Sequence, residues 1–281
     1  MNTLGVVGAG TMGSGIAHTA ARAGLDVLLY DAEEGKASKA VETIGKRLQA
    51  QVEQGKMARA EADALLERLH VVGALEDLAR SEAAVEAVLE VMDIKRDVFR
   101  RLDAILPAGA LLCTNTSSLS ITELAQATGR RDRVAGLHFF NPAPVMRLVE
   151  VVRGEDTSDA TVRDAVALAE RLGKETVVVE KDTPGFIVNR ILMPLFIEAM
   201  RILEEGIASP EDIDKAVKLG LNHPMGPLTL ADLTGLDVDL NVMDYLYNEV
   251  HDDRFAAPLV LRRLVRAGRL GRKTGRGFYS Y

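Results

Sequence analysis

His138 is the residue whose place in the sequence best suits acid–base chemistry. Of the five histidines in the chain, it alone directly follows an apolar run, 134–137, that predicts a strand of a central sheet. Ligands bind in the crevice outside the carboxyl ends of such strands, so a histidine here could take a proton from a substrate hydroxyl and return it. From position alone, a structural histidine is an equally good interpretation.

Glu150 offers this histidine a partner. It lies inside the apolar run Leu148–Val152, where burying an unpaired carboxylate would cost several kcal/mol. A histidinium would satisfy the carboxylate, and the carboxylate would hold the ring ready to accept a proton. A structural salt bridge to an arginine is the alternative.

Small polar side chains follow another predicted strand, Leu111–Thr114. The cluster Asn115-Thr116-Ser117-Ser118 would lie at the same edge of the sheet as His138, where a hydroxyl could bond a substrate oxygen. Such clusters after strands are also routine helix caps, so both interpretations stay open.

A glycine-rich segment near the N-terminus predicts a dinucleotide-binding turn. Gly8-Ala9-Gly10-Thr11-Met12-Gly13 follows the apolar run 4–7 and opens an Ala-rich helical stretch. Gly8 permits the tight turn, Gly10 lets a pyrophosphate approach the backbone, and Gly13 lets the helix pack on the strand. We assign Gly8, Gly10, Thr11, Met12 and Gly13 to cofactor binding.

Asp31 favours NAD as the cofactor. It ends the second predicted strand, close to the roughly 20-residue spacing at which an acid bonds the ribose 2′-hydroxyl. A carboxylate there would repel the 2′-phosphate of NADP. FAD uses the same motif, but the chain lacks obvious length for a flavin-covering domain; an ordinary turn with Asp31 as a helix cap is the remaining alternative.

The predicted strands and helices that must position these residues alternate along the first two thirds of the chain, as in βα units around a parallel sheet. We expect helices between strands at 4–7, 27–30, 84–88, 111–114 and 134–137, and added strands at the far edge of the sheet at 148–152 and 176–179. The stretch 33–69, rich in Ala, Glu, Lys, Arg and Gln, predicts a helical hairpin broken at 54–56.

Asp182-Thr183-Pro184 marks the predicted domain boundary, because N-cap candidates followed by proline indicate a helix start. Beyond it the sequence indicates helices joined by Gly/Pro turns. We therefore predict an α/β fold: a Rossmann-type sheet domain with a helical hairpin insertion over residues 1–182, followed by an all-α domain over 183–281.

Composition excludes several functional classes. The 281 residues are 47% hydrophobic and 27% charged, as in ordinary globular proteins, and the net charge of −7 argues against nucleic-acid binding. Cys113 is the only cysteine, which excludes intrachain disulfides and clustered thiolate metal sites, and we expect no metal. With no visible signal peptide and no bilayer-spanning segment, we expect a cytoplasmic protein without membrane contact.

Together these residues resemble the 3-hydroxyacyl-CoA dehydrogenase family, particularly its short, single-function 3-hydroxybutyryl-CoA branch. The resemblance runs along nearly the whole chain, in segments 8–13, 85–90, 115–119, 138–146, 182–190, 222–228 and 271–279.

The resemblance implies roles for individual residues. His138 would be the acid/base and Glu150 its orienting partner; Ser117 would be a hydroxyl donor to the substrate oxygen, and Asn189 a further contact with the substrate. The implied cofactor-facing set is Asp31, Glu90, Lys95, Asn115, Ser117, Asn141 and Lys273. Without the resemblance, Glu90 and Lys95 would be interpreted as surface charges.

The implied reaction is the NAD-dependent oxidation of a short L-3-hydroxyacyl-CoA, such as 3-hydroxybutyryl-CoA, to the 3-ketoacyl-CoA, and its reverse. Substrate would lie between the domains, and the helical domain would form a homodimer. Some bacterial relatives carry CoA-associated lysines where this chain has Ala50 and Gln54. We therefore take Lys56 as a substrate-binding candidate, alongside Lys46 and Arg59.

Three other functions fit parts of the pattern. A 3-hydroxyadipyl-CoA dehydrogenase would use the same residues on a carboxylated substrate. A β-hydroxyacid dehydrogenase with a catalytic lysine would share the two-domain plan, but His138, Glu150 and Ser117 count against it. A non-enzymatic, crystallin-like NAD-binding protein would keep the fold, but the retention of every catalytic candidate counts against it.

Overall fold

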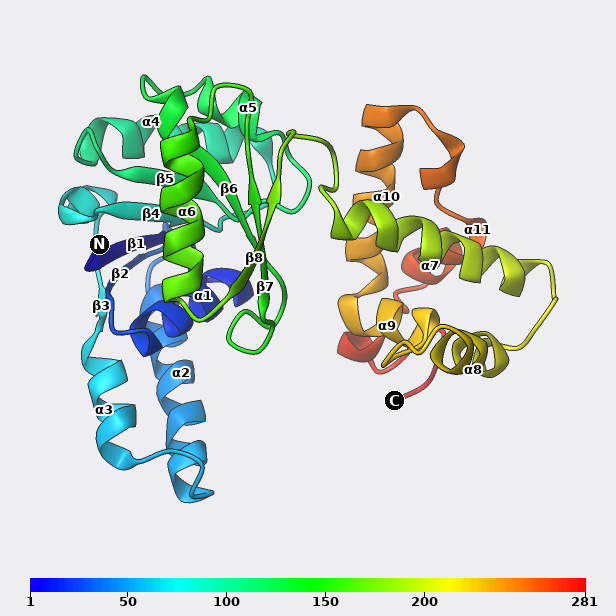
Figure 1. Ribbon diagram of the computed structural model, residues 1–281. Helices are drawn as coiled ribbons and strands as arrows, with labels where there is room; N and C mark the ends of the chain where they lie inside the picture. The colour runs from blue at the N-terminus through cyan, green and yellow to red at the C-terminus, as the bar shows by residue number, and fades with distance from the viewer. The chain divides into compact units, whose positions relative to one another are not determined.

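The computed structural model describes residues 1–281, which divide into two compact units, Met1–Asp182 and Thr183–Tyr281. The first unit holds an eight-stranded sheet in the order β3-β2-β1-β4-β5-β6-β7-β8, flanked by helices (Figure 1). Strands β1 to β6 are parallel, whereas β7 runs antiparallel to β6 and β8 runs parallel to β7. The order of the first six strands is that of doubly wound dinucleotide-binding domains, so the predicted fold class is confirmed.

The strands are short, and most of their residues are buried. They are β1 Thr3–Val7, β2 Asp26–Tyr30, β3 Leu69–Val71, β4 Ala83–Glu86, β5 Leu111–Thr114, β6 Val134–Phe139, β7 Leu148–Val152 and β8 Glu175–Val179. Strand β3 escapes prediction because three residues at the end of a helical stretch are too few to show a period of two. Strand β4 ends at Glu86, two residues before the predicted end.

The helices of the first unit include the predicted hairpin. They are α1 Thr11–Arg22, α2 Lys36–Glu53, α3 Arg59–Glu67, α4 Met92–Ile105, α5 Ile121–Ala125 and α6 Asp159–Arg171. Helices α2 and α3 run side by side away from the sheet (Figure 1). Only a few of their residues, such as Ile44 and Leu48, join the core, so most of the hairpin surface is left to solvent or to a ligand.

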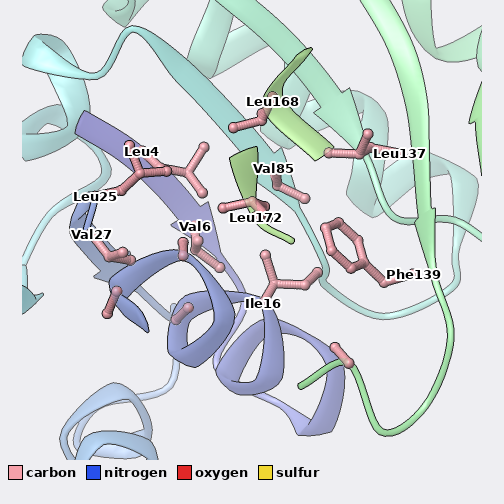
Figure 2. Packing of buried hydrophobic residues seen from close by; sticks show 14 of the residues in the cluster. Leu4, Val6, Ile16, Leu25, Val27, Val85, Leu137, Phe139, Leu168 and Leu172 are labelled. Carbon is pink, nitrogen blue, oxygen red and sulfur yellow. The ribbon is translucent and has the colours of Figure 1, made fainter. Parts of the chain in front are cut away.

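The main core of this unit lies between one face of the sheet and helices α1 and α6. Figure 2 shows Ile16 of α1 packed among strand side chains that include Val6, Val85, Leu137 and Phe139. Burying each such side chain contributes about 1.5–3 kcal/mol. Because side chains alternate along a strand, placing Leu137 and Phe139 in this core turns the intervening His138 to the other face of the sheet.

The second unit is built from helices, as predicted, with isolated β-bridges only near the C-terminus, at Gly271–Arg276 and Arg276–Ser280. Its helices are α7 Val188–Glu204, α8 Pro210–Gly220, α9 Pro227–Thr234, α10 Leu236–Val250 and α11 Leu259–Arg266. They enclose a separate core that includes Phe196, Met243 and Phe255. The C-terminal segment is anchored on the buried Asp232 carboxylate, which accepts hydrogen bonds from the backbone N–H groups of Phe278 and Tyr279.

The helix predicted to start at Asp182-Thr183-Pro184 begins later, at Val188. Gly185 (φ 74°) and Phe186 (φ 50°) adopt left-handed backbone conformations, which cannot continue a right-handed helix. Asp182 does not cap α7; its carboxylate accepts hydrogen bonds from the Ser120 hydroxyl and the Thr122 backbone N–H at the start of α5.

Candidate functional site

The three glycines of the first turn have different surroundings. Gly8 has φ 100°, and a Cβ on Gly13 would lie 1.8 Å from the Gly8 carbonyl oxygen, so both positions require glycine for the fold itself. A Cβ on Gly10 would meet no protein atom within 4 Å. Gly10 therefore borders open space at the N-terminus of α1, where Thr11 and Met12 begin the helix and their backbone N–H groups lack intrahelical partners. This geometry fits a pyrophosphate.

Asp31 joins this turn to the end of β2. Its Oδ2 accepts a hydrogen bond from the Ala9 N–H at 2.6 Å, and its Oδ1 accepts one from the Glu33 N–H at 2.9 Å. Helix α2 has Gly35 as its N-cap, so Asp31 is not a helix cap. A carboxylate beside the glycine turn fits the acid that bonds a ribose hydroxyl.

His138 and Glu150 lie directly opposite each other on the antiparallel strands β6 and β7. Nδ1 of His138 is 2.7 Å from Oε2 of Glu150, and the two side chains are 6% and 0% exposed. The imidazole also packs against the ring of Phe140, with 4.6 Å between centroids. A carboxylate at Nδ1 selects the tautomer and the orientation of the ring, so proton exchange with a ligand would take place at Nε2.

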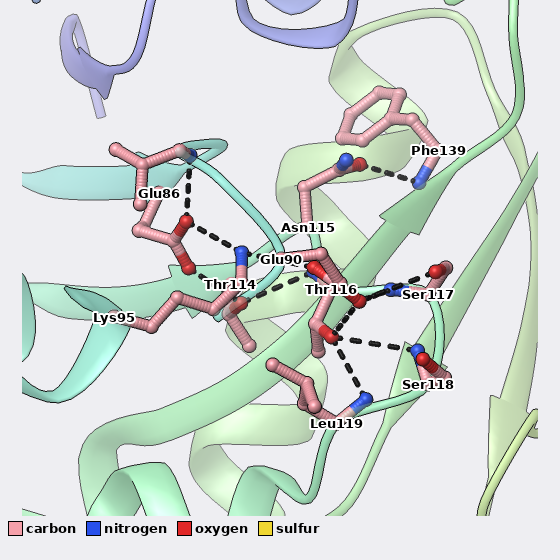
Figure 3. A network of polar contacts seen from close by, with 11 residues as sticks. Glu86, Glu90, Lys95, Thr114, Asn115, Thr116, Ser117, Ser118, Leu119 and Phe139 are labelled. Carbon is pink, nitrogen blue, oxygen red and sulfur yellow. Dashed lines mark hydrogen bonds and ion pairs between the residues drawn. The ribbon is translucent and has the colours of Figure 1, made fainter. Parts of the chain in front are cut away.

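The loop after β5 is held by Glu90. Oε1 of Glu90 accepts hydrogen bonds from the Thr116 hydroxyl at 2.5 Å, the Ser117 N–H at 2.9 Å and the Ser117 hydroxyl at 3.2 Å (Figure 3). Helix α5 is capped by Ser120, whose hydroxyl accepts a hydrogen bond from the Glu123 N–H. The cluster 115–118 therefore does not cap this helix.

Asn115 connects this loop to β6. Its Oδ1 accepts a hydrogen bond from the Phe139 N–H at 2.9 Å (Figure 3), directly beside His138 in the chain. The loop that carries Ser117 is thus tied to the end of the strand that carries the histidine. The glycine turn belongs to the same edge of the sheet, because a Cβ on Gly8 would touch Ala87, which follows β4.

Lys95 is not a surface charge, although an isolated lysine in an amphipathic helix suggests one. Its side chain is 1% exposed, and its Nζ lies 2.7 Å from Oε1 of Glu86 and 3.2 Å from Oε2 of Glu90. Burial raises the pKa of Glu90, but the Lys95 charge and the hydrogen bonds from Thr116 and Ser117 outweigh it, so the pKa lies below its usual value. Glu90 is 39% exposed and is the member of this group that a ligand can reach.

Sequence reasoning missed Glu86. Its carboxylate is completely buried at the end of β4, and burial raises its pKa against the opposing effects of Lys95 and Thr114. The sequence signal is a carboxylate inside the apolar run 83–89, the same pattern that draws attention to Glu150, but the sequence identifies no partner for Glu86.

The other predicted site residues are not part of this cluster in the first unit. Asn141 is exposed in the loop after β6, and the buried Lys174 holds this loop by donating hydrogen bonds to the carbonyls of Ala143 and Met146. Lys56 is exposed in the turn of the α2–α3 hairpin. Two further residues belong to the second unit: Asn189 lies in the first turn of α7, and Lys273 forms an ion pair with Asp237.

The sheet edge thus combines a glycine turn whose geometry fits a dinucleotide with an oriented histidine–carboxylate pair. No group of three or more His, Cys, Asp or Glu side chains is placed to hold a metal ion, and none of the helices has the length and apolarity needed to cross a bilayer. A dinucleotide site beside an acid–base group defines the class of nicotinamide-dependent oxidoreductases.

Family models assign the chain within that class. Residues 3–183 match the NAD binding domain of 3-hydroxyacyl-CoA dehydrogenase, and residues 185–281 match the C-terminal domain of the same family. The chain belongs to the 3-hydroxyacyl-CoA dehydrogenase family and is an NAD-dependent oxidoreductase. This confirms the family resemblance and the cofactor predicted from the sequence.

Two relatives are similar over nearly their full length, and a third over a little more than half of it. A 3-hydroxybutyryl-CoA dehydrogenase of Clostridioides difficile is 47% identical over 99% of both chains. The crystal structure of an (S)-3-hydroxybutyryl-CoA dehydrogenase from Ralstonia eutropha superposes with a TM-score of 0.95 at 46% identity, covering 100% of this chain and 99% of that chain. A 3-hydroxyadipyl-CoA dehydrogenase of Escherichia coli is 44% identical over 100% of this chain and 59% of its own length.

Proposed function

We propose that the protein interconverts a short L-3-hydroxyacyl-CoA, such as 3-hydroxybutyryl-CoA, and the corresponding 3-ketoacyl-CoA with NAD. The observation that carries the proposal is the buried His138–Glu150 pair, with 2.7 Å between Nδ1 and Oε2, at the sheet edge that also holds the glycine turn and Ser117. The names of the Clostridioides difficile and Ralstonia eutropha relatives support the substrate class.

In this mechanism His138 is the acid–base catalyst. Its Nε2 takes the proton of the 3-hydroxyl group during oxidation and returns it during reduction, while Glu150 stabilises the charged imidazole. Ser117 bonds the 3-oxygen: Glu90 fixes the Ser117 backbone N–H, and the Ser117 hydroxyl, which donates to Glu90 in this structure, turns to the substrate. Bound NAD supplies the hydride acceptor for C3 of the substrate.

NAD would be held by the glycine turn and selected by Asp31. The pyrophosphate would approach the open backbone at Gly10 and the first N–H groups of α1, at Thr11 and Met12. The Asp31 carboxylate would accept a hydrogen bond from the ribose and repel a 2′-phosphate.

We also propose contacts for the remaining predicted residues. Glu90, Asn115, Asn141 and Lys273 would face the cofactor, with Lys95 acting through Glu90 because its own side chain is buried. Asn189 would bond the substrate oxygen, and Lys56 would contact the CoA moiety. Alanine variants of Asn189 and Lys56 separate the last two roles, because the first should lower kcat and the second should mainly raise KM for the CoA substrate.

The decisive experiment follows NADH absorbance while the purified protein is offered acetoacetyl-CoA. Parallel arms contain NADPH, longer 3-ketoacyl-CoA substrates and 3-ketoadipyl-CoA, and the variant His138→Gln is the control for background reduction. Rapid NADH-dependent reduction that is lost in the variant supports the proposal. A clear preference for 3-ketoadipyl-CoA would instead assign the activity named for the Escherichia coli relative.

If acetoacetyl-CoA and the other ketones remain unreduced although NADH binds, the dehydrogenase proposal fails and a non-enzymatic NAD-binding role replaces it. NADH binding can be followed by the rise in cofactor fluorescence on direct excitation of the reduced nicotinamide, since the chain contains no tryptophan to act as an energy-transfer donor.

We propose further that the helical unit forms a homodimer. Its surface exposes several large apolar side chains, including Ile191 at 68%, Ile207 at 67% and Leu219 at 75%, and exposed apolar surface favours association. Light scattering coupled to size-exclusion chromatography should give twice the 30.4 kDa chain mass. A mass equal to one chain would contradict this.

A further inference from the structure

Glu86 is bonded through both oxygens at the end of β4. Oε1 accepts a hydrogen bond from the Val88 N–H at 2.7 Å and lies 2.7 Å from Nζ of Lys95, while Oε2 accepts a hydrogen bond from the Thr114 hydroxyl at 2.7 Å (Figure 3). One buried carboxylate thereby joins the end of β4 to helix α4 and to the end of β5.

Two chains of contacts lead from Glu86 to the loop that carries Ser117. The first chain of contacts runs through Lys95, whose Nζ lies 3.2 Å from Oε2 of Glu90. Oε1 of Glu90 then accepts a hydrogen bond from the Thr116 hydroxyl at 2.5 Å. In the second, the Thr114 hydroxyl accepts a hydrogen bond from the Thr116 N–H at 3.1 Å. Both chains end on Thr116, so the contacts close into a ring.

Side chains of this ring hold the backbone N–H groups of the loop that carries Ser117. The Thr116 N–H is bonded by Thr114, the Ser117 N–H by Glu90 at 2.9 Å, and the Leu119 N–H by the Thr116 hydroxyl at 2.9 Å. These three N–H groups of the loop are therefore satisfied by side chains of the ring and not by regular secondary structure. Glu86 is thus connected to the Ser117 N–H through Lys95 and Glu90.

Stability alone does not account for a carboxylate at this position. Glu86 is 0% exposed, and replacing a buried ion pair by apolar residues of similar volume is often neutral or stabilising. Apolar side chains could neither orient Lys95 toward Glu90 nor accept a hydrogen bond from the Thr114 hydroxyl, because both contacts require an oxygen acceptor.

We infer that Glu86 is a positioning residue that fixes Glu90 and Ser117 through Lys95 and Thr114. This inference rests on the proposed function, in which Ser117 bonds the substrate oxygen. Glu86 itself touches no ligand, because its carboxylate is completely buried. Its effect on catalysis comes from the accuracy with which the Ser117 loop is held.

The variant Glu86→Gln keeps the shape of the side chain and removes its charge. We expect kcat for acetoacetyl-CoA reduction to fall about 10- to 100-fold, because displacement of a catalytic loop by about 1 Å has effects of this order. The Kd for NADH should rise by a smaller factor than kcat falls, because Glu90 is displaced but the glycine turn and Asp31 are untouched. Asp97→Asn, which changes a 60% exposed carboxylate on α4, the helix that carries Lys95, should leave kcat and NADH affinity unchanged.

A pair of variants at Thr114 tests the second chain of contacts without altering any charge, and it remains informative if Glu86→Gln does not fold. Thr114→Val removes the hydroxyl that joins Glu86 to the Thr116 N–H, and kcat should fall several-fold. Thr114→Ser keeps the hydroxyl and should restore kcat to near the wild-type value. Equal losses of kcat in the two Thr114 variants would argue for packing and against positioning.

Amide hydrogen exchange measures the position of the loop independently of turnover. In Glu86→Gln, a peptide covering residues 114–119 should exchange faster than in the wild type, while a peptide from the glycine turn should be unchanged. A folded Glu86→Gln protein with wild-type kcat and wild-type exchange in this peptide overturns the inference. A parallel loss of kcat, NADH affinity and thermal stability in this variant also overturns the inference, because it would indicate general damage to the fold. A wild-type protein without turnover refutes the proposed function, and exchange in this peptide still decides whether Glu86 positions the loop.

Discussion

His138 and Glu150 face each other across the only antiparallel strand pair of the sheet, with Nδ1 of the histidine 2.7 Å from Oε2 of the glutamate. Residues directly opposite on neighbouring strands share one face of a sheet, so the register alone directs both side chains to the same side. The contact is carried by two rigid strands, and the proposed catalytic base therefore does not depend on a flexible loop for its orientation.

Replacing either member of this pair should abolish most of the turnover. His138→Gln should lower kcat about 10²- to 10⁴-fold, because it removes the proton acceptor. Glu150→Gln keeps a hydrogen-bonding group but loses the charge that stabilises the imidazolium, and should lower kcat by at least about tenfold. NADH fluorescence titration should show unchanged cofactor affinity in both variants. Near-wild-type kcat in His138→Gln would remove this residue from the mechanism.

Two glycines of the first turn should respond differently to the same substitution. Gly10→Ala adds a methyl group where no protein atom lies within 4 Å, so its free energy of unfolding should stay within about 0.5 kcal/mol of the wild type. The methyl group would occupy the space proposed for the pyrophosphate, and NADH affinity should fall at least about tenfold.

Gly13→Ala is the matched comparison, because its Cβ would lie 1.8 Å from the Gly8 carbonyl oxygen. This variant should lose stability by several kcal/mol, as expected for overpacking against backbone atoms. Thermal unfolding and NADH titration distinguish the two variants. If Gly10→Ala bound NADH as tightly as the wild type, the pyrophosphate would have to lie elsewhere.

Asp31→Asn should weaken the preference for NAD over NADP. The wild-type carboxylate lies beside the glycine turn, 2.6 Å from the Ala9 nitrogen and 3.7 Å from Nζ of Lys36. Removing this charge ends the repulsion of a 2′-phosphate and leaves Lys36 without that carboxylate. The ratio of kcat/KM for NADH to kcat/KM for NADPH should therefore fall at least about tenfold, which corresponds to about 1.4 kcal/mol. Because the ratio is internal to one protein sample, general instability does not mimic the effect. An unchanged ratio would show that another group selects the cofactor.

The parts of the fold that sequence predicts well are those with a local signal. Apolar runs such as Leu148–Val152 coincide with strands, and the glycine turn lies between a strand and a helix as its spacing requires. The start of α7 is displaced because nothing in the sequence signals that Phe186, a bulky residue, adopts a left-handed conformation. That conformation follows from tertiary contacts and not from local preference.

The parts of the site that escape prediction depend on residues distant in the chain. Without the family resemblance, which places Lys95 in the cofactor-facing set, this lysine is interpreted as a surface charge, because its two carboxylate partners become apparent only when β4 and α4 are packed together. Glu86 is bonded to Thr114, which is 28 positions away. Whether a charged residue is buried depends on such distant partners, and periodicity carries no information about them.

Asp239 should make the stability of the helical unit depend on pH. Its carboxylate is 2% exposed, and Thr234 donates its hydroxyl to it at 2.8 Å. Burial raises the pKa of Asp239 to about 8, whereas an unfolded aspartate has a pKa of about 3.9. Between these values the folded state binds the additional proton, so this residue's contribution to the free energy of unfolding falls as pH rises from about 4 to about 8 and levels off above that.

Asp239→Asn removes this titration and can still accept the Thr234 hydroxyl. The variant should therefore be more stable than the wild type at pH 8, with an advantage that shrinks steadily toward pH 5. Urea unfolding at several pH values measures the difference, and the exposed Asp253→Asn variant controls for the loss of one negative charge. A stability difference that does not vary with pH would mean that Asp239 is ionised in the folded protein throughout this range.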